Sequence, residues 1–289
     1  MLAVIAGEGA LPPLLFAALD ARNEAFHLCE MDGHPCDKRG DRPVIRFRVE
    51  QLGSFISDLK SLGVSKVCMA GKMQRPPLDV SQIDEATKPL VPRFMTAMQQ
   101  GDDALLRTVL GFFEERQIFA IGAHELRPDL LPEPGVLSEA QPADHHTKDA
   151  QRGAEIIAAM AQVDVGQACI VSSGQALAIE ALPGTDWMMQ SLMAQNQPLN
   201  PDLLATDTGQ GGVLQRSNLL PPGGVLVKAA KPGQELRVDM PVIGPDTVRR
   251  AVQLQLDGIV IEAGRVMMLD TPRCVEIANK HDLFLWVRA

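Results

Sequence analysis

Residues 2–12 read LAVIAGEGALP, and this stretch decides the fold of the N-terminal half of the chain. The five apolar residues from Leu2 to Ala6 are typical of a buried strand. Gly7 and Gly9 follow the strand and predict a tight turn, and the proline at position 12 is typical of the first turn of a helix. A strand, a glycine turn and a helix in this order indicate the first unit of a parallel α/β sheet.

The same alternation of strand and helix patterns continues to residue 121. It predicts a mostly parallel sheet with helices on both faces, whose ligands sit at the carboxyl ends of the strands, where the strand order reverses. Further strands are expected at residues 25–29, 44–47, 66–70 and 118–121, and helices at residues 12–21, 51–62 and 102–115.

The periodicity stops between residues 124 and 143, where four prolines interrupt a polar stretch that predicts a linker without helix or strand. We therefore expect two domains, a Rossmann-like domain at residues 1–135 and an α/β domain of unusual fold at residues 136–289, with a ligand cleft between them. The second domain begins with a helix at 147–161 and a hairpin at 168–180. Later strands are expected at residues 225–227, 258–261, 266–269 and 284–287, helices at 186–195, 247–255 and 272–280, and a long loop at 196–222.

The composition excludes several classes of protein. A formal net charge of -9 argues against a nucleic-acid binder, which needs concentrated positive charge. The five cysteines form no C-x-x-C pair, so neither a disulfide framework nor a zinc site is indicated. The N-terminus lacks a basic region and no apolar run reaches the length of a membrane span, so we expect a cytoplasmic protein.

Residues 224–247 read GVLVKAAKPGQELRVDMPVIGPDT, and the fourteen residues from 228 to 241 carry three cations and two carboxylates on a segment that prolines and glycines make rigid. Such a segment favours metal-assisted chemistry on a phosphate ester or anhydride, because carboxylates hold hard cations and basic side chains neutralise phosphate oxygens. We expect Asp239 to be the principal Mg²⁺ ligand and Glu235 a second one, with Lys228, Lys231 and Arg237 near the phosphates. The alternative is a solvated charged loop.

The glycine turn at residues 7–9 favours contact with a nucleotide or a sugar phosphate, although Pro12 stands where the third glycine of a dinucleotide motif belongs. Gly71 and Arg75 follow another strand and are expected at the same sheet edge. The alternatives are a turn without a ligand and ordinary surface charge.

Other polar residues allow two interpretations each. Asp102 precedes a helix and is first of all a capping residue. Glu180 ends an apolar strand and is placed to face a cleft. His145 and His146 invite a metal interpretation, but we expect solvated loop histidines, because adjacent side chains point apart.

With these residues in place, the chain resembles the UDP-2,3-diacylglucosamine pyrophosphatase family of lipid A biosynthesis, the alphaproteobacterial type that is distinct from the metallophosphoesterase-type isozyme. The resemblance covers essentially the whole chain. Its motifs include Gly9-Ala-Leu-Pro12, Met69-Ala-Gly71, Gly101-Asp-Asp, Gly184-Thr-Asp186 and Gln234-Glu-Leu-Arg-Val-Asp-Met-Pro241.

The resemblance implies two domains that close over the substrate, and Mg²⁺-dependent hydrolysis of the diphosphate to 2,3-diacylglucosamine 1-phosphate, or lipid X, and UMP. The family's key aspartate corresponds to Asp239, and we expect Lys228, Glu235 and Arg237 to assist it. The substrate-binding residues expected on the matching motifs and beside them are Gly7, Gly9, Leu11, Pro12, Gly71, Arg75, Asp102, Thr185, Lys231 and Gln234.

Two other functions stay open from the sequence. One is a nucleotide-dependent transferase or reductase that uses the glycine turn, and the other is a carrier that binds a UDP-sugar or lipid without turnover. The acyl chains of the expected substrate need an apolar pocket, for which the Met-rich stretch at residues 187–193 is a candidate. Peripheral contact with the inner membrane and a homodimer are also left open.

Overall fold

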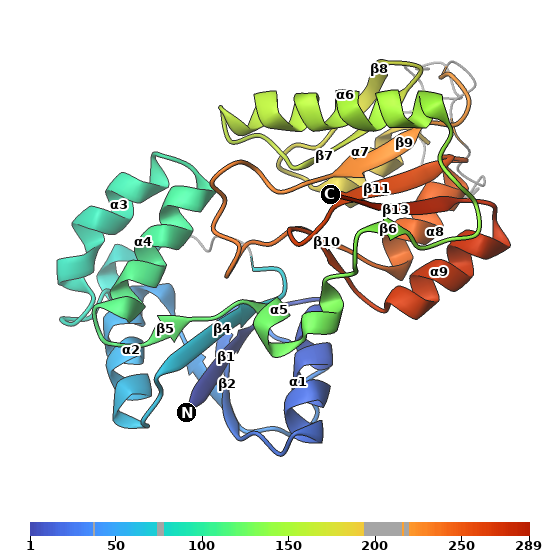
Figure 1. The fold of residues 1–289 in the computed structure, drawn as a ribbon. Coiled ribbons are helices and arrows are strands. Elements are labelled where there is room, and N and C mark those ends of the chain that lie inside the picture. Colours follow the sequence, from blue (N-terminus) through green and yellow to red (C-terminus); the bar gives the residue numbers. More distant parts are fainter. Residues whose placement is uncertain (37, 74–77, 194–215, 217–219) are drawn as a thin grey trace, which may run out of the picture. The chain divides into compact units, whose positions relative to one another are not determined.

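A five-stranded parallel sheet in the order β3-β2-β1-β4-β5 forms the centre of the N-terminal half (Figure 1). The strands are β1 (Leu2–Ala6), β2 (Phe26–Met31), β3 (Val44–Phe47), β4 (Lys66–Ala70) and β5 (Phe119–Ala120), and every neighbouring pair is parallel. This computed structural model describes residues 1–36, 38–73, 78–193, 216 and 220–289. The predicted parallel sheet is confirmed, and the strand order reverses between β1 and β4.

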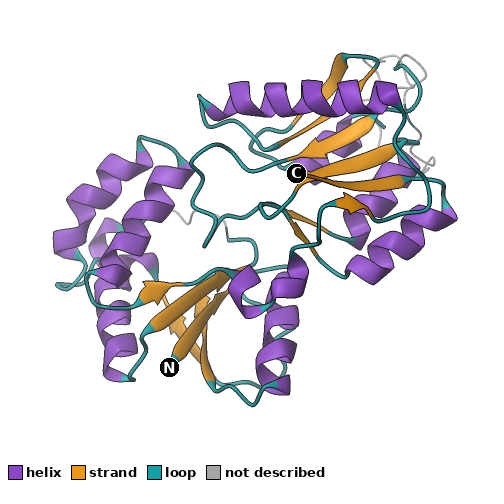
Figure 2. Cartoon of the chain, in the orientation of Figure 1, coloured by secondary structure: helices purple, strands orange, loops and turns teal. Residues whose placement is uncertain are grey.

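Helices cover both faces of this sheet, with α1 and α5 on one face and α2 and α4 on the other (Figures 1 and 2). A core cluster beneath α2 and α4 includes the fully buried Phe113 and Leu59. The helices are α1 (Leu11–Ala21), α2 (Leu52–Ser61), α3 (Val91–Met98), α4 (Asp102–Glu114) and α5 (Ala123–Leu126), with short 3₁₀ turns η1 (Val49–Gln51), η2 (Val80–Gln82) and η3 (Lys88–Leu90).

The C-terminal half is built on a six-stranded sheet in the order β6-β13-β11-β9-β7-β8, with a separate parallel pair β10-β12. The central strands β9, β11 and β13 are parallel, whereas β7 and β8 form the predicted antiparallel hairpin. The strands are β6 (Gly135–Val136), β7 (Ala168–Ser172), β8 (Gln175–Ile179), β9 (Val225–Lys228), β10 (Val242–Ile243), β11 (Gly258–Glu262), β12 (Met267–Met268) and β13 (Phe284–Arg288). Helix α6 (Asp144–Ala161) covers one face, and α7 (Thr185–Ser191), α8 (Pro245–Gln253) and α9 (Thr271–Lys280) cover the other (Figure 1).

The expectation of an unstructured linker is wrong in part. Residues 123–136 contain α5, the 3₁₀ turn η4 (Pro128–Leu130) and the edge strand β6. These elements span two to four residues, which is too short to show a helical or strand period in the sequence. The predicted loop at residues 196–222 lies mostly outside the described residues.

The chain divides into two compact units that do not follow the sequence order. Unit 1 comprises Met1–Asp129 and Gln234–Met240, and unit 2 comprises Leu130–Gly233 and Pro241–Ala289. Val238 packs against the core of unit 1. The segment at residues 234–240, which carries Asp239, therefore packs with the N-terminal half, whereas the predicted domain limits place it in the C-terminal one. Within the described part of the chain, no helix is both long enough and apolar enough to cross a membrane.

Candidate active site

Two glycine loops meet at the point where the strand order of unit 1 reverses. The loop after β1 and the loop after β4 pair through their backbones: Glu8 N donates to Lys72 O at 3.0 Å, and Lys72 N donates to Glu8 O at 2.9 Å. A Cβ atom on Gly7 would lie 2.4 Å from Lys72 O, and one on Gly71 would lie 2.7 Å from Glu8 O. Only glycine permits this close approach, so the two predicted loops are brought together at the sheet edge where ligands of such folds bind.

The start of α1 offers few donors to a phosphate. Its first turn contains Pro12 and Pro13, which have no N–H, and the N–H groups of Gly7 and Glu8 already bond to the last residue of β4 and to the loop after it. The side chains of Leu11 and Pro12 are buried. A substrate would therefore meet this loop through Gly9, which is exposed at a φ of 104°, and through backbone rather than side chains.

Asp239 lies on the segment that packs with unit 1, and Gln234 holds it in place. The Gln234 amide Nε2 donates to Asp239 Oδ2 and to the Asp239 carbonyl, each at 2.6 Å. Asp239 N donates to the Glu235 carbonyl at 3.0 Å, which closes one helical turn of backbone. Gln234 is buried and Asp239 is half-buried, so a fixed amide orients a carboxylate that retains partial access to solvent.

Glu235 and Arg237 bind each other rather than Asp239. Arg237 Nε donates to Glu235 Oε1 at 2.9 Å and Arg237 Nη2 to Glu235 Oε2 at 2.8 Å, while Nη1 donates to Glu114 of α4 at 2.8 Å. The hydrogen bonds from Arg237 lower the pKa of Glu235, and the same bonds raise the pKa of Arg237. Both Glu235 oxygens are thus occupied by a guanidinium.

The N-terminal turn of α4 binds the same segment. Asp103 Oδ1 accepts a hydrogen bond from Glu235 N at 3.0 Å, and Asp103 Oδ2 pairs with Arg107 at 2.7 Å. Its neighbour Asp102, the predicted substrate contact, is exposed. Residues 234–240 are therefore attached at both ends of α4, at Asp103 and at Glu114.

A second polar group lies in unit 2, at the carboxyl end of β9. Lys228 is buried, and its ammonium donates to Thr185 Oγ1 at 2.7 Å. The Thr185 hydroxyl in turn donates to the buried Glu180 at 2.6 Å, and the other Glu180 oxygen accepts from Gln167 N at 2.9 Å. The predicted residues Lys228 and Thr185 thus belong to one hydrogen-bonded chain that ends on a carboxylate.

The loop after β9 is fixed by an ion pair and by hydrogen bonds to its backbone. Lys231 Nζ lies 2.5 Å from Asp164 Oδ1, and Arg265 Nη2 donates to the Lys231 carbonyl at 3.1 Å. Glu262, at the end of β11, accepts from Ala230 N at 3.1 Å. Unit 2 therefore brings Lys228 and Lys231 to the same sheet edge, where both ammonium groups contact acidic or hydroxyl partners.

The expectation of solvated loop histidines is wrong for His146, whereas His145 is exposed but lies in a helix. His145 and His146 lie in the first turn of α6, and their rings are 3.8 Å apart. His146 is buried, its Nδ1 accepts from Ala143 N at 3.0 Å, and its Nε2 lies 3.3 Å from Asp257 Oδ2. Nδ1 of His146 thus caps the start of α6, and its Nε2 faces Asp257. His145, His146 and Asp257 each offer one ligand atom, and these atoms lie within 4.8 Å of one another, so this group could hold a metal ion.

Asp239 fits a hard cation better than the other predicted ligand does. Mg²⁺ binds one or two carboxylates together with water and substrate phosphate oxygens. Asp239 is half-buried and its orientation is fixed by an amide, whereas Glu235 is bound on both oxygens by Arg237. Arg75, another predicted contact, lies outside the described residues.

The sequence missed the partners that fix these residues, namely Glu114, Asp103, Asp164 and Gln167. Charged residues on exposed helices are common, and nothing local distinguishes Glu114 from its neighbour Glu115. The contacts of Asp103 and Glu114 could be predicted only if it were known that residues 234–240 pack beside α4.

The comparisons with known proteins cover both halves of the chain. The model of the LpxI N-terminal domain matches residues 1–130, and the model of the LpxI C-terminal domain matches residues 133–286. A curated relative, UDP-2,3-diacylglucosamine pyrophosphatase LpxI of Caulobacter vibrioides, is 32% identical over 284 residues, which cover 98% of this chain and 96% of the relative. With both domain models matched in order and the relative aligned along nearly its full length, the chain belongs to the LpxI family.

Proposed function

We propose that this protein hydrolyses the diphosphate of UDP-2,3-diacylglucosamine to 2,3-diacylglucosamine 1-phosphate and UMP, as a step of lipid A biosynthesis. The observation that supports this best is the Asp239 carboxylate, oriented by Gln234 on a segment that is anchored to α4. The similarity to a UDP-2,3-diacylglucosamine pyrophosphatase over 98% of the chain supplies the substrate.

The reaction exchanges one bond to phosphorus. A water oxygen bonds to one of the two phosphorus atoms, the bond from that phosphorus to the bridging oxygen breaks, and the protons of the water are distributed between the products and solvent. Each product keeps one phosphate. The chain has to hold the diphosphate, orient the water and compensate the negative charge that develops on the leaving oxygen.

The proposal includes Mg²⁺ held by Asp239 and by oxygens of the substrate. When bound, the ion would supply charge neutralisation and polarise a phosphoryl oxygen. Gln234 keeps the carboxylate in one orientation by donating to Oδ2 at 2.6 Å. Glu235 is proposed as a structural partner of Arg237 rather than as a second ligand, because the guanidinium binds both of its oxygens.

The glycine loops and the lysines are proposed to bind the substrate. The paired loops at Gly7 and Gly71 leave the backbone of Gly9 open to a phosphate or sugar. Lys228 and Lys231 are the cations proposed to neutralise diphosphate oxygens. Contact with the inner membrane and a homodimer stay predictions.

The buried acid Glu30 near the end of β2 gives the dinucleotide alternative no support. A Rossmann fold that binds NAD uses an acidic residue there to bind the ribose. Here the buried Glu30 accepts from Arg39 Nη1 at 2.9 Å on each oxygen and from Cys36 N at 3.1 Å. Its carboxylate is therefore already engaged within the protein.

The test is release of UMP from UDP-2,3-diacylglucosamine by the purified protein, with added Mg²⁺ and with EDTA. We expect UMP and 2,3-diacylglucosamine 1-phosphate in equal amounts, loss of turnover in EDTA and recovery on adding Mg²⁺. Asp239→Asn should lower kcat by at least about 100-fold, whereas Asp58→Asn on the exposed side of α2 should not change it. Turnover by Asp239→Asn near the wild-type rate would refute the proposed role of Asp239. Full activity in EDTA would refute the proposed requirement for Mg²⁺.

A further inference from the structure

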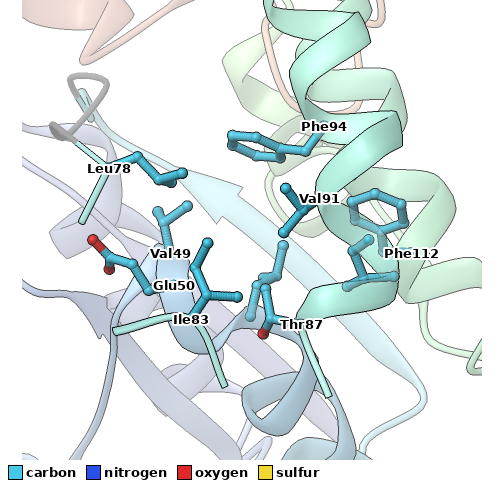
Figure 3. Close-up of a pocket in the computed structure, with 10 residues that line it drawn as sticks. Val49, Glu50, Leu78, Ile83, Thr87, Val91, Phe94 and Phe112 are labelled. Carbon is cyan, nitrogen blue, oxygen red and sulfur yellow. The ribbon is translucent and has the colours of Figure 1, made fainter. Parts of the chain in front are cut away.

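An apolar pocket lies in unit 1, apart from the polar residues described above (Figure 3). The space between its lining residues, including the part open to solvent, is about 300 Å³. Figure 3 shows Leu78, Val49 and Ile83 across from Val91 and Phe94 of α3. The pocket is thus lined by α3 and α4, by the residues that follow β3, and by the segment between β4 and α3.

The two polar residues among the lining have their hydrogen-bonding groups engaged elsewhere. Glu50 Oε1 accepts from Asp79 N at 2.9 Å, and Oε2 lies 3.4 Å from Arg48 Nε. Figure 3 shows the Glu50 carboxylate pointing away from Val91 and Phe94. The hydroxyl of Thr87 accepts from Gly53 N at 2.8 Å. A ligand in this pocket would find hydrocarbon and bound polar groups, so an apolar ligand fits it and a polar one does not.

The rim of the pocket exposes apolar surface. Leu78, Ile83, Leu90, Val91 and Phe94 are all half-buried. In α3 itself, only Ala97 is buried. A helix that only packed on the sheet would bury a broader apolar stripe, so α3 has apolar surface to spare for a further partner.

The pocket is connected to the segment that carries Asp239. Leu90 and Phe94 pack against the same core cluster as Val238, the neighbour of Asp239. Helix α4 contributes Phe112 to the pocket and Asp103 to the anchor of residues 234–240. Helix α4 also contributes Glu114, the second anchor of residues 234–240, two positions after Phe112. The pocket and the segment that carries Asp239 thus share one helix and one core cluster within unit 1.

We infer that this pocket binds an acyl chain of the substrate. The inference rests on the proposed function, because that function supplies a substrate with two acyl chains. The earlier candidate, the Met-rich stretch at residues 187–193, does not fit this role: Met188 and Met189 are buried in the core of unit 2. The acyl pocket is assigned to α3 and its surroundings instead.

The first test fills the pocket and varies the chain length. Val91→Trp should lower kcat/KM for a long-chain UDP-2,3-diacylglucosamine by about 10-fold, since each methylene kept out of an apolar site weakens binding several-fold. The same variant should hydrolyse a short-chain analogue within about twofold of the wild-type rate. Met95→Trp is the matched control, because Met95 lies on the same helix, is exposed and does not line the pocket. Equal losses for both chain lengths, or none, would overturn the inference.

The second test needs no variant and so does not depend on whether Val91→Trp folds. A long-chain substrate analogue with a photoreactive diazirine at one chain end is crosslinked to the wild-type protein and located by mass spectrometry. We expect insertion within residues 78–94, and a free fatty acid in excess should reduce it. Insertion elsewhere overturns the pocket. Failure of the proposed function has a different signature, namely no UMP from the wild type with any chain length.

Discussion

Arg237 donates to Glu114 at 2.8 Å, and this contact joins two residues that are 123 positions apart in the chain. Arg237 also binds both oxygens of Glu235, whose backbone N–H is held by Asp103. The charges around Asp239 thus bind one another and the helix. We therefore interpret Glu235 and Arg237, two of the residues expected to assist catalysis, as residues that position the Asp239 carboxylate.

Breaking the Glu114 contact should lower activity more than stability. Glu114→Gln removes one anchor of residues 234–240, and we expect kcat to fall about 10-fold as Asp239 loses its fixed position. The side chains of Arg237 and Glu114 are both 38% exposed, so the loss of folding free energy should stay within about 1 kcal/mol.

Glu115→Gln is the matched control for this variant. Glu115 follows the last residue of α4 and pairs at 2.6 Å with Arg93 of α3 rather than with Arg237. The Glu115→Gln variant should leave kcat unchanged and should lower the free energy of unfolding by a similar amount. Steady-state kinetics and thermal melting of the two variants decide the matter, and equal kcat values for both would contradict the positioning role.

The Glu235–Arg237 pair predicts a specific pH dependence of stability. Hydrogen bonds from Arg237 lower the pKa of Glu235 in the folded protein. The pair therefore contributes its stability fully above the unfolded pKa of about 4.3 and loses it as the pH falls through the lower folded pKa.

Urea unfolding of the wild type and Glu235→Gln across this range provides the measurement. The difference in unfolding free energy between them should be largest near neutral pH and should shrink below about pH 4. A difference that grows toward acid would show that the carboxyl is preferred in its protonated form.

Thr185 is expected to matter as a hydroxyl that connects two buried charges. Thr185→Val leaves the Lys228 ammonium and one Glu180 oxygen without this partner, which should cost about 1–3 kcal/mol of folding free energy. Thr185→Ser keeps the hydroxyl and should recover most of it. Chemical denaturation compares the two, and identical stabilities would show that the hydroxyl is not what connects the pair.

The paired glycine loops should not tolerate a side chain. Gly7→Ala places a Cβ 2.4 Å from Lys72 O, so the loops must separate, and we expect lower stability and weaker substrate binding. Gly111→Ala, inside α4, is the contrasting control. Its Cβ would lie 3.6 Å from the guanidinium of Arg93, and alanine at this position should stabilise the helix by up to about 1 kcal/mol. Melting temperatures and KM values check both, and a neutral Gly7→Ala would refute the close pairing.

The sequence predicts most of the regular elements for a physical reason. Buried parallel strands such as β1 and β4 are short apolar runs bounded by turn residues, and that pattern is local. Helix α3 was missed although its apolar residues recur at helical spacing, because it is only eight residues long and Pro89 and Pro92 stand at and just before its start. Short elements that begin at prolines are hard to tell from loops in a sequence.

The sequence predicts which residues belong to the candidate site, but it does not predict which residues they contact. Charge, proline and glycine at residues 224–247 identify the segment, but the partners of Arg237 and Lys228 lie 123 and 43 positions away. His146 shows the same limit, since its burial depends on Asp257 and on the ring of Phe284, 4.8 Å away. Contacts between distant residues are set by tertiary packing, which a single sequence does not display.

The insertion of residues 234–240 into unit 1 has a consequence for biosynthesis. The first 129 residues leave the ribosome about 110 residues before Val238, which completes their core. At a synthesis rate of about 5–20 residues per second, the nascent N-terminal half waits roughly 5 to 20 seconds without this segment. During that interval the apolar surface that Val238 covers is open to chaperones, and Asp239 joins the N-terminal half only after more than 230 residues have been synthesised.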